Sequence, residues 1–60
     1  MDLKGRFYKV YNSLPLGLRD EVVWVMDNEP ITWKVAKLEI DNNTPISNEL
    51  LEKLAGLNFI

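Results

Sequence analysis

The chain has 60 residues, of which 47% are hydrophobic, and its formal net charge is −2. Residues 1–60 can form one small domain, and so short a chain buries only about 60% of the surface that its unfolded form exposes. The sequence contains no cysteine and no histidine, which excludes disulfides, thiolate metal sites and the commonest general base near neutral pH. We therefore expect no metal and no cofactor, and a partner subunit as the source of extra stability.

Charge and hydropathy also bear on partner and compartment. A slightly acidic chain disfavours a dedicated nucleic-acid binder, which usually presents a basic face. The longest unbroken apolar run, Val22 to Met26, is far too short to cross a membrane, and the first ten residues lack the apolar core of a signal peptide. We therefore expect a cytoplasmic protein without a membrane segment.

The first predicted helix covers residues 2–13. Its apolar residues recur at the spacing of one helical face, and they are Leu3, Phe7, Val10, Tyr11 and Leu14. A strand over residues 6–11 is the competing interpretation, because Phe, Tyr and Val favour sheets. The longer helical pattern leads us to prefer the helix.

The second predicted helix covers residues 15–27. Pro15 suits its first turn, Ser13 is expected to cap it, and an apolar face follows at Leu18, Val22, Val25 and Met26. The β-branched run in this segment also predicts an alternative, a β-hairpin over residues 21–40 that turns at residues 27–30. We prefer the helix because the alternation in residues 31–40 changes face midway, which a strand accommodates only with a bulge.

The third predicted helix, residues 30–41, is apolar on two opposite sides. At 100° per residue, one side holds Ile31, Val35 and Leu38, and the other holds Trp33, Ala36 and Ile40. Asp27 or Asn28 is expected to cap this helix, with Pro30 in its first turn. A helix with two apolar sides must be covered twice.

The fourth predicted helix covers residues 47–56. Ser47 is expected to cap it, Gly56 to occupy the C′ position, and Leu50, Leu51, Leu54 and Leu57 to form its apolar face. Together the four segments predict an all-α domain of four short helices packed as two antiparallel hairpins. The alternative is an α+β fold with a hairpin at residues 21–40 and a C-terminal helix.

The two-sided third helix predicts a non-catalytic protein-interaction module that acts as a homodimer or an adaptor. Tryptophan and tyrosine often anchor interfaces, and large apolar patches seldom persist without a partner. The expected interface residues are Trp33, Ala36, Ile40, Trp24, Val23 and Tyr8. The opposing interpretation is that the four-helix domain wraps both sides of its own third helix.

A nucleic-acid-binding regulator of the helix-turn-helix type is the alternative function. The last two predicted helices end in a sequence pattern that is common in such domains. Five basic residues would form a patch if the first and third helices presented them together: Lys4, Arg6, Lys9, Lys34 and Lys37. Against it, the connection over residues 41–46 exceeds the three or four residues of that motif. The last helix also presents two glutamates toward a phosphate backbone.

Three further possibilities find weaker support. A small-molecule carrier would need an apolar cavity, which the sequence would place between Phe7, Tyr11, Trp24 and Trp33. A calcium loop starting at Asp41 fails, because Pro45 and Ile46 stand where the loop needs an oxygen ligand and a glycine. With no histidine or cysteine, and with serines placed as helix caps, we expect no enzyme activity.

Overall fold

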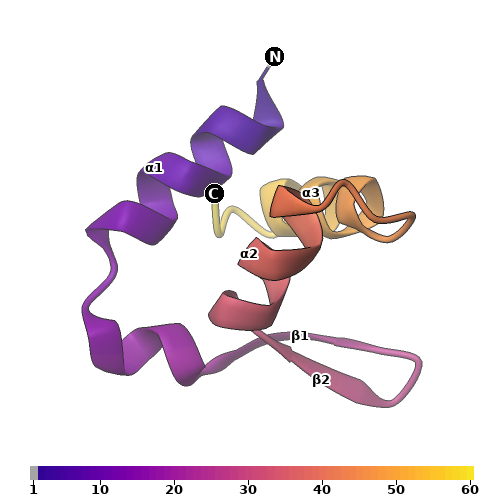
Figure 1. Ribbon diagram of the computed structural model, residues 1–60, viewed down its shortest axis with the longest axis horizontal. Helices are drawn as coiled ribbons and strands as arrows, with labels where there is room; N and C mark the ends of the chain where they lie inside the picture. The colour runs from indigo at the N-terminus through magenta and orange to yellow at the C-terminus, as the bar shows by residue number, and fades with distance from the viewer. Residues whose placement is uncertain (1) are drawn as a thin grey trace.

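The computed structural model describes residues 2–60, which form an α+β fold. The elements follow in the order α1 (Leu3–Ser13), the 3-10 helix η1 (Leu16–Asp20), β1 (Val22–Met26), β2 (Glu29–Thr32), α2 (Trp33–Asp41) and α3 (Ser47–Gly56). Figure 1 shows α1, α2 and α3 grouped together and the β1–β2 hairpin below them. The predicted all-α fold is therefore wrong, and the alternative α+β class is correct.

Residues 15–27 are not a helix but a short 3-10 turn followed by a strand. The turn buries none of its residues, so a longer helix at this position would have had little to pack against. In β1 three of five residues are valines, whose branched side chains lose rotamer freedom in helices and fit a pleated surface. This preference outweighs the helical spacing of Leu18, Val22 and Met26.

The hairpin contains the bulge that a strand interpretation requires. Val22 pairs with Thr32, but Trp24 pairs with Ile31, so Val23 is an extra residue in β1. Asp27 and Asn28 form the turn, and both have positive φ angles of 51° and 68°. Two such residues define a type I′ turn, whose twist matches that of the strands, and Asp and Asn tolerate this conformation better than most residues.

The second arm of the hairpin ends at Thr32, where α2 begins without a loop. The Thr32 hydroxyl oxygen accepts a hydrogen bond from the backbone N–H of Val35 at 3.1 Å, which satisfies one of the free donors of the first turn. The helix predicted over residues 30–41 therefore starts three residues later. Pro30 lies in β2, and residues 27 and 28 form the hairpin turn rather than a helix cap.

The C-terminal ends of α2 and α3 are each followed by an asparagine in the left-handed conformation. After α3, Asn58 has a φ angle of 62°, its N–H donates to Ala55, and the N–H of Phe59 donates to Leu54. These two backbone bonds make a Schellman motif. Asn43 ends α2 in the same way, with a φ angle of 49°.

The two caps predicted for the fourth helix are wrong, although its bounds of 47–56 are correct. Gly56 is the last helical residue and does not have a positive φ angle. Ser47 is the first helical residue, and its hydroxyl donates to the carbonyl oxygen of Thr44 at 2.8 Å instead of accepting from the helix.

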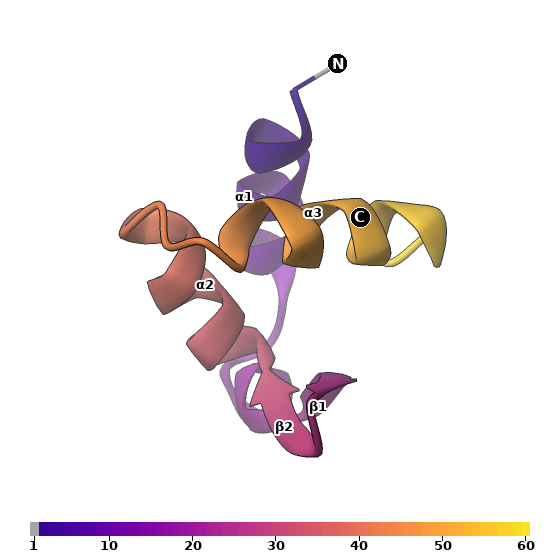
Figure 2. The ribbon, with the colours of Figure 1, turned by 90° about the vertical axis from the view of Figure 1, so that its right-hand side faces the viewer.

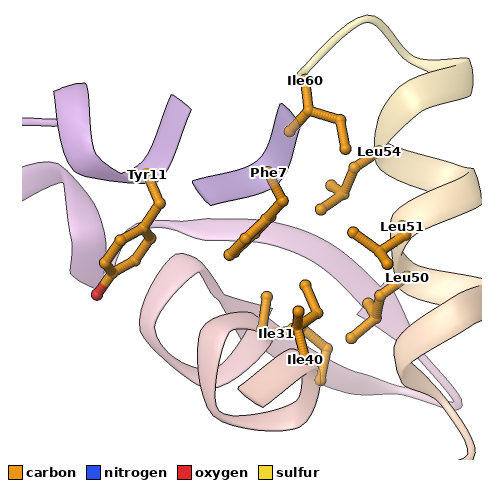
Figure 3. Close-up of a cluster of buried hydrophobic side chains, with 9 residues drawn as sticks. Phe7, Tyr11, Ile31, Ile40, Leu50, Leu51, Leu54 and Ile60 are labelled. Atoms are coloured by element: carbon orange, nitrogen blue, oxygen red, sulfur yellow. The ribbon is translucent and has the colours of Figure 1, made fainter. Parts of the chain in front are cut away.

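The core forms around Phe7, which is fully buried. Its ring centroid lies 5.8 Å from that of Tyr11 and 5.9 Å from that of Trp33. Figure 3 shows α1 presenting Phe7 toward leucines of α3 and toward Ile40 of α2. The other buried apolar residues are Tyr11, Ile31, Ala36, Ile40, Leu50, Leu51, Leu54 and Ile60. The predicted apolar face of the first helix is thus confirmed, and that of the last helix is confirmed at Leu50, Leu51 and Leu54, whereas Leu57 is 47% exposed.

Candidate interaction surface

Helix α2 is apolar on two sides, but the sides are exchanged relative to the prediction. Ala36 and Ile40, expected to contact a partner, are 0% and 1% exposed within the chain's own core. Val35 and Leu38, placed with Ile31 on the side opposite the expected interface, are 36% and 55% exposed. The prediction grouped Val35 and Leu38 with Ile31 on one face of a helix. Ile31 belongs instead to strand β2 and is buried there, so its burial does not indicate which side of α2 faces the core.

The other predicted interface residues line the edges of the core. Trp33, Trp24 and Val23 are half-buried and pack against the buried cluster. Tyr8 is half-buried between α1 and α2. Its ring packs edge-on against that of Phe7, and the two ring centroids lie 5.8 Å apart. The structure therefore does not bring the six predicted residues together on one exposed surface.

The apolar surface that is exposed comes largely from residues outside the predicted set. Among the described residues, the large exposed apolar side chains are Leu16, Leu18, Val22, Val25, Val35, Leu38, Leu57 and Phe59. Two of them form the outer side of α2, and two lie on β1. The alternation of Trp24, Val25 and Met26 was the signal in the sequence that Val25 would point away from the core once this segment is a strand.

A polar seam joins α1 to the end of α2. The Tyr8 hydroxyl donates a hydrogen bond to Asp41, and Lys37 Nζ lies 2.7 Å from the other Asp41 carboxylate oxygen. The hydrogen bonds from Lys37 and then Tyr8 lower the pKa of Asp41. The hydrogen bond to this carboxylate in turn raises the pKa of Tyr8.

The five basic residues do not form an uninterrupted patch. Lys34 Nζ lies 3.3 Å from Asp20, and Lys37 contacts Asp41. Lys4 donates to the side-chain oxygen of Asn43 at 3.1 Å, Arg6 donates to the carbonyl oxygen of Ile60 at 2.6 Å, and Lys9 is exposed on α1. These contacts place acids among the lysines of α2, which weakens attraction to a phosphate backbone.

The predicted carrier cavity is filled by the aromatic rings themselves, because Phe7 packs against Tyr11 and Trp33. A hollow of about 340 Å³ lies elsewhere, where α1, α2 and α3 meet. Its lining includes Lys4, Ser47 and Glu52.

Residues 2–60 contain no cluster of three acidic, histidine or cysteine side chains suited to a metal ion. Across the same residues, each helix is too short or too polar to traverse a bilayer. No protein-family model, curated protein or solved structure matches the chain. A functional assignment must therefore come from the geometry of the surface.

Proposed function

We propose that the chain is a small non-catalytic protein-interaction module that binds its partner through the outer side of α2. The supporting observation is that α2 is apolar on two sides and the fold covers only one of them. Val35 and Leu38 lie one turn apart on the uncovered side. Covering neighbouring apolar side chains lowers the free energy of the complex, and such patches commonly mark protein interfaces.

The residues around this side favour a second copy of the chain as the partner. Val35 and Leu38 have the spacing of the a and d positions of a coiled-coil heptad, with Lys34 at g and Glu39 at e. In a parallel pair, each g residue lies near the e residue of the other helix, which would bring Lys34 of one copy toward Glu39 of the other. A β-branched a residue with leucine at d also favours two-stranded assembly.

Sedimentation equilibrium over a range of protein concentrations tests this proposal. We expect the mass to rise from 7.0 kDa, that of one chain, toward twice this value. Leu38→Gln should shift the transition to at least about tenfold higher concentration, which corresponds to about 1.4 kcal/mol. Leu16→Gln is the matched control, because Leu16 is exposed on η1 rather than on α2, and it should associate like the wild type.

A charge exchange tests the parallel arrangement separately. Glu39→Lys should weaken association, and the double variant Lys34→Glu with Glu39→Lys should restore it, because the pairing of opposite charges returns. A mass of 7.0 kDa at every concentration, or equal association of the Leu38→Gln variant, would contradict α2 as the contact between copies.

A further inference from the structure

The hairpin has two open edges, and only one of them can accept another strand at its centre. Within residues 2–60 the sheet consists of β1 and β2 alone. Val25 pairs with Pro30, which has no backbone N–H, so this pair cannot exchange the two hydrogen bonds of a bonded pair. Val25 therefore directs its backbone N–H and C=O away from β2, while Pro30 leaves the opposite edge without a donor.

The side chains of β1 leave this edge open. Folded proteins usually guard an edge strand with charged residues or proline. Strand β2 has both Glu29 and Pro30, whereas β1 has neither a charge nor a proline. Val25 is 58% exposed, and Figure 2 shows the hairpin below the helices with β1 on the side away from α2.

Acidic residues at both ends of β1 indicate which strand this edge fits. Glu21 and Asp27 flank the strand and are exposed, and the sequence from Asp20 to Glu29 contains no basic residue. A second copy of β1 would therefore bring acids and no basic residue to this edge. Opposite charges in facing positions favour strand pairing, so the edge fits a strand with basic ends better than it fits its own copy.

We infer that the outer edge of β1 binds an extended segment of another protein, apolar or neutral at its centre and with lysine or arginine at both ends. In antiparallel pairing, the residue opposite Val25 would exchange both backbone hydrogen bonds with it. The basic ends would lie opposite Asp27 and Glu21, where opposite charges favour pairing. This site uses a surface other than the outer side of α2, so either proposal can fail without the other.

The probe is the acetylated and amidated peptide Lys-Thr-Val-Thr-Val-Thr-Lys, whose first valine would lie opposite Val25 and whose lysines would lie opposite Asp27 and Glu21. Titrated into the full chain and followed by NMR, it should give saturable shifts with a dissociation constant below about 1 mM. Hydrogen exchange of the Val25 amide should slow in the complex. The same peptide with glutamate at both ends should bind at least about tenfold more weakly.

Two matched changes test the backbone contact. Val25→Pro removes the N–H at the open edge but takes no bond from the β1–β2 pair, and it should abolish peptide binding. Val25→Thr keeps the N–H and the preference for strands, and it should bind like the wild type. If Val25→Pro fails to fold, a peptide with N-methylated valines and the wild-type chain make the same test.

Unchanged exchange of the Val25 amide at about 1 mM peptide, or undiminished binding by the Val25→Pro variant or of the N-methylated peptide, would overturn the inference. Protection of Val25 that grows with protein concentration and without peptide would also overturn it, because a second copy would then occupy the edge.

Discussion

At the scale of single residues, the contact of Tyr8, Lys37 and Asp41 gives the chain a defined pH dependence. The pKa of Asp41 is lowered in the folded state, first by Lys37 and then by Tyr8. Its stabilising contribution is therefore present above the ordinary carboxyl pKa of 3.8 and is lost as the pH falls through the lowered value. We expect Asp41→Asn to reduce the free energy of unfolding near neutral pH and to flatten its decline below about pH 4, as measured by urea unfolding.

The alkaline side of the same contact has the opposite sign. The hydrogen bond to Asp41 raises the pKa of Tyr8 above 10.0, so its contribution is present below that pH and is lost as the pH rises through the raised value. Tyr8→Phe keeps the ring and removes the hydroxyl. It should abolish this alkaline loss and raise the pKa of Asp41, observed by NMR of its carboxyl carbon; an unchanged Asp41 pKa would show that the hydrogen bond is not made.

The end of α3 offers a second test at single residues. Asn58 has the left-handed conformation and Gly56 does not, and the space around Gly56 is open. Asn58→Ala should therefore cost about 1 kcal/mol, because alanine lacks the short polar side chain that lets asparagine tolerate a positive φ angle. Gly56→Ala should raise the free energy of unfolding by about 0.5–1 kcal/mol through helix propensity. The opposite pattern in thermal or urea unfolding would place the C′ residue at Gly56.

At the scale of elements, Thr32 is the residue on which the start of α2 depends. Its hydroxyl caps the helix, while its backbone pairs with Val22 in the hairpin. Thr32→Val keeps the shape and the strand preference but removes the cap, so it should cost about 1 kcal/mol of stability. Thr32→Ser keeps the hydroxyl and should cost less. Equal losses in urea unfolding would indicate that the hydroxyl contributes nothing.

The sequence predicts α1 and α3 well, because their apolar residues repeat over several turns and no competing alternation exists. Residues 15–32 resist prediction for a physical reason. The valines of β1 fit both a helical face and a strand, and the extra residue Val23 breaks the simple alternation that would have identified the strand. Only the tertiary context, which gives the strand a partner and the helix no core, decides between them.

The candidate surface was less predictable than the fold. Two apolar sides on α2 are visible in the sequence, but their spacing does not tell which side the core covers. That choice depends on where the helix begins, and Ile31 suggested the wrong side because it belongs to β2. The open edge of β1 could not be foreseen until the hairpin replaced the predicted second helix.

At the scale of the whole molecule, one pair of substitutions tests which side of α2 faces the core. Ile40 is among the largest fully buried side chains, and Leu38 is more than half exposed. Ile40→Ala should cost about 3 kcal/mol, most of the stability available to a chain of this size. Leu38→Ala should change it by less than about 0.5 kcal/mol. Urea unfolding at low protein concentration, where association does not contribute, measures both; equal losses would contradict this orientation.

The junction at Thr32 has a mechanical consequence. Since one residue closes the hairpin ladder and caps the next helix, no flexible loop separates β2 from α2. The hairpin and the helix are therefore joined directly at Thr32, where the chain changes direction. A rotation of the hairpin would therefore tilt the first turn of α2 and change the direction in which Val35 and Leu38 point.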